Sequence, residues 1–161
     1  MPKFSVEKIV NAPKATVWTL LADFENIDFF NDAINKSYLT EGSDNGGLGA
    51  TRHCDLSDGK NYLKERVLKW DEGEGMTIDI YATSMPIKSN IVRFELEQFG
   101  DKTKARMIFD YELKFGILGK IMSKLGLTAF MRKQTNLVLD GLAQKAEAAH
   151  KQANLHVVSA A

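Results

Sequence analysis

The chain has 161 residues and no formal net charge, because 21 Lys and Arg balance 21 Asp and Glu. This length suits one domain with a sizeable core, and 44% hydrophobic and 26% charged residues are ordinary globular values. The balanced charge argues against a nucleic-acid-binding protein, which needs a basic excess. The single cysteine, Cys54, excludes a disulfide within the chain and fits a reducing compartment.

Targeting and membrane segments are not indicated either. The first residues, MPKFSVEK, lack the apolar core of a signal peptide, and no apolar run approaches the ~20 residues that a membrane-spanning helix needs. We therefore expect a cytoplasmic protein in which residues 1–161 form one domain, present as a monomer or a weak dimer. The sequence indicates no particular protein partner.

The first part of the chain predicts one strand and two short helices. Residues 3–10, KFSVEKIV, are β-branched and partly alternating, as in a strand. Asn11 is expected to cap a helix over 15–22, with Pro13 in its first turn. A second short helix is expected over 25–30. Its aromatic cluster is interpreted as core or a cap over one end of a sheet, with a ligand lid as the alternative: Phe24, Ile27, Phe29 and Phe30.

From residue 36 the hydrophobic period changes to two, which predicts strands. Turn signals such as SDNGG, SDG and DEGEG leave short connections, so successive strands should pair antiparallel in a meander. Alternation is clearest over 87–115, where one face is apolar and the other charged. The expected strands cover 36–41, 49–56, 61–70, 75–83, 87–99 and 103–115.

The last third of the chain has a helical pattern. Gly126 offers a break, which leaves a main helix over 128–150, and residues 151–161 are expected to be a frayed tail. The fold class is therefore α+β: a seven-stranded curved antiparallel sheet wrapped around a long C-terminal helix, with two short helices after the first strand. A twisted sheet around one helix rarely fills completely, so we expect a pocket between them.

The stretch GGLGATRHCDLSDGKNYLKERV, residues 46–67, holds the residues of greatest chemical interest. Its Asp-Gly dipeptide at 58–59 is a strong signal for a two-residue type I′ hairpin turn, in which both central residues need positive φ. A tip at this dipeptide places Cys54, Arg52 and Glu65 on the apolar face, with Arg52 directly opposite Glu65. We therefore expect a hairpin that carries an ion pair pointing into the protein.

Two rival interpretations of this stretch are weaker. A phosphate-binding loop needs glycines that lead into a helix, whereas a strand follows here. A zinc site needs three or four converging ligands, but His53 and Cys54 are adjacent and point to opposite faces. Cys54 fits a small buried hydrophobe better than a nucleophile, because no histidine shares its face. We expect no metal and no cofactor.

The order of elements, together with NAPKATVW, GLGATRHCDLSDG and KERVLKWDEG, resembles the START-like or Bet v 1-like (SRPBCC) superfamily, most closely its bacterial polyketide cyclase/dehydrase-type proteins. The resemblance covers residues 3–150 and implies a helix-grip fold. Plant abscisic-acid receptors, distant members, have a cavity carboxylate at the position of Glu65 and an arginine at that of Arg52. Their latch loop corresponds to residues 85–87, Met-Pro-Ile, which lack the histidine–arginine pair of those receptors.

The leading hypothesis is a binding or carrier protein for a small, largely apolar molecule with one polar or acidic group, lipid-like or polyketide-like, held between sheet and C-terminal helix. One alternative is a metal-free cyclase or dehydratase (lyase-like) in which Glu65 is the base, tuned by Arg52, and Tyr111 the proton donor. Others are a protein-interaction module without a ligand, and an interior filled by its own side chains. The residues expected to line the cavity are Arg52, Cys54, Leu56, Leu63, Glu65, Val67, Ile78, Ile80, Asn90, Val92, Phe94, Met107, Phe109, Tyr111, Phe130, Met131, Gln134 and Val138.

Overall fold

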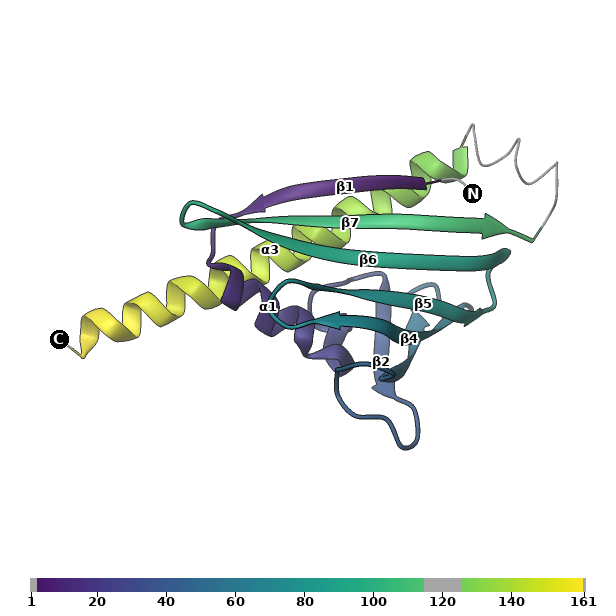
Figure 1. Cartoon of the computed structure of the whole chain (residues 1–161), viewed down its shortest axis with the longest axis horizontal. Coiled ribbons are helices and arrows are strands. Elements are labelled where there is room, and N and C mark those ends of the chain that lie inside the picture. Colours follow the sequence, from purple (N-terminus) through teal and green to yellow (C-terminus); the bar gives the residue numbers. More distant parts are fainter. Residues whose placement is uncertain (1–2, 115–125, 161) are drawn as a thin grey trace.

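The computed structural model describes residues 3–114 and 126–160 of the chain. Within these residues one seven-stranded sheet packs against a long helix, and two short helices follow the first strand (Figure 1). In chain order the elements are β1 (Lys3–Val10), α1 (Lys14–Ala22), the 3-10 helix η1 (Phe24–Phe29), β2 (Ile34–Leu39), β3 (Thr51–Leu56), β4 (Tyr62–Asp71), β5 (Gly75–Thr83), β6 (Ile87–Phe99), β7 (Lys102–Leu113) and α3 (Thr128–Ser159).

The sheet is antiparallel throughout, in the order β1-β7-β6-β5-β4-β3-β2. The predicted meander is confirmed from β2 to β7, where short connections place successive strands side by side. β1 joins the far edge by pairing with β7. The α+β, helix-grip arrangement expected from the sequence is therefore confirmed.

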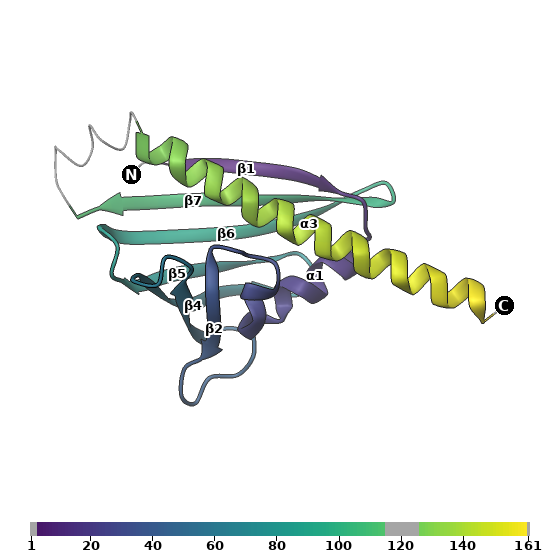
Figure 2. The ribbon, with the colours of Figure 1, turned by 180° about the vertical axis from the view of Figure 1, so that it is seen from behind.

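α3 crosses one face of the sheet diagonally, and its last turns extend beyond the sheet (Figures 1 and 2). We call the face that α3 covers the inner face. The helix buries residues at helical spacing against it, as an amphipathic helix does on a core. These residues are Thr135, Val138, Leu139, Leu142, Ala143 and Ala146.

α3 also touches the segment between η1 and β2 backbone to backbone. A Cβ atom built at Gly141 would lie 2.0 Å from the carbonyl oxygen of Phe30. Only glycine permits so close an approach, because it has no side chain to separate the two backbones. Gly141 therefore sets how near α3 lies to η1.

The predicted start of α1 is wrong. Asn11 does not cap this helix; Pro13 occupies the N-cap position, and no side chain caps it by a hydrogen bond. Asn11 instead donates its backbone N–H and its Nδ2 to Glu147 Oε1, at 2.9 and 3.2 Å. The side chain that the local sequence pattern assigned to the helix cap therefore makes a tertiary contact with α3 instead.

The predicted end of the long helix is also wrong, because α3 continues to Ser159 instead of ending at His150. No glycine or proline follows His150 to stop it, and Ala, Lys, Gln and Leu favour helix. The break expected near Gly126 concerns residues 117–125, which lie outside the described residues. No helix in the described parts of the chain, α3 included, is long and apolar enough to cross a membrane.

The β3–β4 hairpin has the predicted register but not the predicted turn. Arg52 pairs with Glu65 as expected. Gly59 has a φ of 69°, but Asp58 does not share the left-handed conformation, since only glycines among the described residues have positive φ. Asp58 Oδ1 instead accepts hydrogen bonds from the backbone N–H groups of the two residues after Gly59. This side-chain cap stabilises a wider turn without a positive φ at the aspartate.

Two tryptophans and one carboxylate fix α1 to the β4–β5 turn. Trp18 Nε1 and Trp70 Nε1 donate to the two carboxylate oxygens of Glu72 at 2.8 and 2.7 Å, and the rings pack edge to face with centroids 5.0 Å apart. Donation from Trp18, and then from Trp70, holds the pKa of Glu72 below its ordinary value. The contact holds α1, and so the start of η1, against the sheet.

Candidate functional site

A buried ion pair lies on the inner face of the β3–β4 hairpin. Arg52 Nε donates to Glu65 Oε2 at 2.6 Å, and the side chains are only 3% and 8% exposed. The strand register brings them together, because directly opposite residues of an antiparallel pair share a face. Each charge compensates the other, which a buried charge requires.

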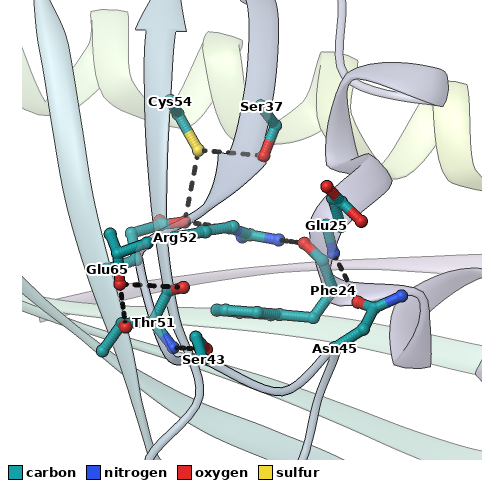
Figure 3. A network of polar contacts seen from close by, with 10 residues as sticks. Phe24, Glu25, Ser37, Ser43, Asn45, Thr51, Arg52, Cys54 and Glu65 are labelled. Atoms are coloured by element: carbon teal, nitrogen blue, oxygen red, sulfur yellow. Dashed lines mark hydrogen bonds and ion pairs between the residues drawn. The ribbon is translucent and has the colours of Figure 1, made fainter.

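The guanidinium of Arg52 also holds η1 in place. Its Nη1 donates to the backbone carbonyl of Phe24, and its Cζ lies 4.0 Å from the centroid of the Phe24 ring (Figure 3). A cation over an aromatic face is attracted by the ring quadrupole. Arg52 therefore joins β3, β4 and η1 at one point.

Cys54 lies beside the ion pair (Figure 3). Its thiol is fully buried and donates to Glu65 Oε2 at 3.7 Å, while the Ser37 hydroxyl lies 3.6 Å from the sulfur. Burial, and then the nearby Glu65 carboxylate, raise the pKa of the Cys54 thiol to about 12. The group is thus a protonated thiol at neutral pH, which fits the predicted structural role.

We expect Cys54 to resist thiol reagents in the folded protein. The thiolate is the reactive form, and a pKa of about 12 leaves very little of it near neutrality. Labelling by an aromatic disulfide should be on the order of 1,000-fold slower than in urea-unfolded protein. Because Cys54 is the single cysteine, absorbance of the released thiolate reports this site alone. Labelling of folded protein at the unfolded rate would contradict the assigned burial.

Four polar residues of the inner face lie in one row across the sheet. Arg52 on β3 pairs with Glu65 on β4, Glu65 pairs with Ile80 on β5, and Asn90 on β6 pairs with Tyr111 on β7. Continuing the β5–β6 register by one residue places Ile80 opposite Asn90. With neighbouring strands about 4.8 Å apart, the row runs roughly 19 Å from Arg52 to Tyr111. We call its four polar members, Arg52, Glu65, Asn90 and Tyr111, the polar row.

The members of the polar row differ in whether their polar atoms have hydrogen-bond partners within the protein. The hydroxyl of Tyr111, which is fully buried, is hydrogen-bonded to Thr128 Oγ1 of α3 at 2.7 Å. Asn90 is 2% exposed, and its Oδ1 has no hydrogen-bond partner among the described residues. Arg93 Nε also has no hydrogen-bond partner among the described residues, but Arg93 lies on the outer face of β6. A buried acceptor without a donor costs about 1–3 kcal/mol, so Asn90 needs an explanation.

The inner face beside Arg52 is filled mainly by its own side chains. The void bounded there by α1, η1, β5 and β6 measures about 10 Å³, enough for one water at most. A larger volume of about 360 Å³ lies in a groove between the η1–β2 segment and α3, lined by Gln134 and Gly141 among others. Phe30 lines the small void, and its backbone lies against Gly141, which lines the groove. The open pocket expected between sheet and helix is thus not found beside Arg52.

Most residues predicted to line a cavity do lie on the inner face, whereas two on α3 do not. Phe130 is 57% exposed, and Gln134 lines the outer groove. Helical phase explains the difference, because at 100° per residue Met131 lies nearer to the middle of the buried stripe of α3, residues 135–146, than Phe130 or Gln134 does. Whether these residues contact a ligand stays a prediction. Besides the polar row, the buried or half-buried residues are Cys54, Leu56, Leu63, Val67, Ile78, Ile80, Val92, Phe94, Met107, Phe109, Met131 and Val138.

Three contact residues of the site were missed in the sequence. Phe24 was assigned to an apolar cluster, but Arg52 binds its backbone carbonyl, 28 residues earlier in the chain. Every residue has such a carbonyl, so the residue type does not indicate this contact. Thr128 is hydrogen-bonded to Tyr111, 17 residues earlier in the chain, and the sequence pattern does not predict which residues of β7 and α3 meet. Ser37 could have been found, because it lies within a predicted strand and pairs directly with Cys54.

Histidine and cysteine do not combine into a metal site in the described ranges. There, no three His, Cys, Asp or Glu side chains gather closely enough to hold an ion. His53 lies on the outer face, stacked between Tyr38 and Tyr62 with ring centroids 5.0 and 5.2 Å away. His53 Nε2 is 3.0 Å from Asp55 Oδ1. His53 and Cys54 therefore point to opposite faces, as predicted.

Comparisons with known proteins agree on one family and one fold. A family model described as "Polyketide cyclase / dehydrase and lipid transport" matches residues 1–147. Comparison with curated proteins gives no match. The chain is similar to a solved protein of Thermus thermophilus, with a TM-score of 0.76 and 19% identity over 92% of this chain and 99% of that one. It is also similar to a START superfamily protein of Mycobacterium smegmatis, with a TM-score of 0.67 and 19% identity over 93% and 97%. The resemblance drawn from the sequence is confirmed.

Proposed function

Because the chain belongs to the polyketide cyclase/dehydrase and lipid transport family, we propose that it binds and carries a small, largely apolar molecule between its sheet and α3. The polar row is the observation that supports this best. It sets four polar side chains in a largely apolar wall, and one buried acceptor in it, Asn90 Oδ1, has no hydrogen-bond partner among the described residues. Ligand sites commonly combine an apolar lining with a few polar groups that orient the ligand.

Binding on the inner face requires part of it to open, since the void beside Arg52 measures only about 10 Å³. The first turns of α3 are the best placed to move. Residues 128–134 are all half-buried or exposed, whereas full burial begins at Thr135. Elements with little buried surface open at low free-energy cost. We infer that the ligand enters beneath these turns, where Tyr111 ends the polar row.

The contacts favour carriage over cyclase or dehydratase chemistry. Arg52 and Cys54 already occupy Glu65 Oε2, and the Tyr111 hydroxyl is bonded to Thr128. Glu65 and Tyr111 stand on β4 and β7, roughly 14 Å apart along the row. An acid and a base that act on one bond must each reach it within hydrogen-bond distance. A carrier has no such requirement.

Native mass spectrometry of gently purified protein, paired with uptake of the uncharged dye Nile red, tests the proposal. Val138 is 8% exposed and faces the sheet, whereas its neighbour Leu137 is 53% exposed. Val138→Phe should abolish the adduct and the dye uptake, because the added ring takes up the space that would open for the ligand. Leu137→Phe, the matched control, should behave as wild type. Thermal melting checks that both variants fold. Wild-type protein that carries no adduct and takes up no dye would overturn the proposal.

A further inference from the structure

We propose that the ligand is uncharged and donates a hydrogen bond, through a hydroxyl or N–H group, to Asn90 Oδ1. This rests on the proposed function and names the chemistry of the ligand's polar end. Asn90 is 2% exposed on the inner face, and its Oδ1 lacks a donor among the described residues. Buried polar atoms in proteins nearly always have a partner, so an open acceptor marks a place for a donor from outside the chain.

Arg52, the other candidate anchor, is already occupied. Its Nε donates to Glu65 at 2.6 Å, its Nη1 donates to the Phe24 carbonyl, and the Phe24 ring covers its face. The Arg52–Glu65 pair is neutral as a whole, so it offers no net charge to an acid. A ligand carboxylate placed here would also meet the Glu65 carboxylate, and like charges in one buried site repel. An acidic ligand is therefore disfavoured.

The surroundings of Asn90 define the rest of the ligand. Across the strands its inner-face neighbours are Ile80 and Tyr111, and along β6 its neighbour is Val92. Tyr111 is the one polar residue among these three, and its hydroxyl is bonded to Thr128. The nearest carboxylate of the polar row, that of Glu65, lies two strands away and is paired, so no counter-charge favours a cationic ammonium group. A ketone or ether oxygen cannot donate to Asn90 Oδ1 either. What remains is an alcohol, a phenol or an amide N–H on an apolar body.

Calorimetric titration with three probes of equal chain length tests this chemistry: decanol, decyl methyl ether and decanoate. In wild-type protein decanol should bind roughly tenfold more tightly than the ether, because only the alcohol can donate. Asn90→Leu should make the two affinities equal while leaving thermal stability unchanged or higher, since it removes an unpaired polar group. Ser89→Ala, on the outer face of the same strand, should keep the preference.

Should Asn90→Leu fail to fold, the side-chain amide resonance of Asn90 in wild-type protein gives the same information. It should shift on addition of decanol and not of the ether. Equal binding of alcohol and ether, or tightest binding of decanoate, would overturn the inference while leaving the carrier proposal standing. A failure of all three probes to bind would overturn both.

Discussion

Gly141→Ala should lower the free energy of unfolding by about 2–3 kcal/mol. In an ordinary helix this change stabilises by about 1 kcal/mol, because alanine is the better helix former. Here the new Cβ would lie 2.0 Å from Phe30 O and 3.1 Å from the Phe30 carbonyl carbon, so one backbone must move. The move would push α3 away from η1 along the whole buried stretch. Urea denaturation followed by far-UV circular dichroism measures the effect.

Gly126→Ala is the matched control for this prediction. Gly126 precedes α3, is exposed, and has no atom within 4 Å of the position of an added Cβ. Its substitution should leave stability unchanged or slightly raised. If Gly141→Ala proved as stable as wild type, the close packing of α3 on Phe30 would be wrong.

Arg52→Met should cost about 3–5 kcal/mol of unfolding free energy, because it leaves the Glu65 carboxylate buried without its cation. It also removes the donor to the Phe24 carbonyl and so loosens η1. Glu65→Leu should destabilise to a similar degree, since Arg52 would then be a buried, uncompensated cation. Both values are measured by urea denaturation near neutral pH.

The double variant Arg52→Met with Glu65→Leu separates the charge from the packing. It should be more stable than either single variant, because apolar side chains of similar volume replace a neutral pair. The outer pair of Arg66 and Asp79, at 3.1 Å and with Arg66 48% exposed, gives the control. Arg66→Met should cost only about 0–1 kcal/mol. Equal losses for Arg52→Met and Arg66→Met would refute the buried ion pair.

Patterns that depend on neighbouring strands were readable from the sequence. Period-two alternation and short turns specify an antiparallel meander, and the hairpin at residues 58–59 sets Arg52 opposite Glu65 whichever turn type closes it. The register was therefore right although the turn was wrong. Asp58 has two ways to stabilise a tip, and only the structure shows that its side chain caps the turn.

Features that depend on contacts between segments far apart in the sequence could not be predicted from it. The Phe24 carbonyl meets Arg52, and Phe30 meets Gly141, only once η1 lies under α3. The cap assigned to Asn11 failed for the same reason, since Glu147 binds it from the far end of the chain. Phe130 faces solvent because helical phase is fixed by packing at residues 135–146, which sequence spacing defines only loosely.

The central claim is that an apolar ligand lies between the sheet and α3 with its polar end at Asn90. Anomalous diffraction from crystals of the protein with an ω-bromodecanol tests it most directly, because bromine marks one end of the ligand and the hydroxyl the other. The account predicts a bromine peak on the inner face and a hydroxyl oxygen about 2.7–3.0 Å from Asn90 Oδ1. A bromine peak in the outer groove beside Gln134 and Gly141, with the inner face still filled by its own side chains, would contradict it.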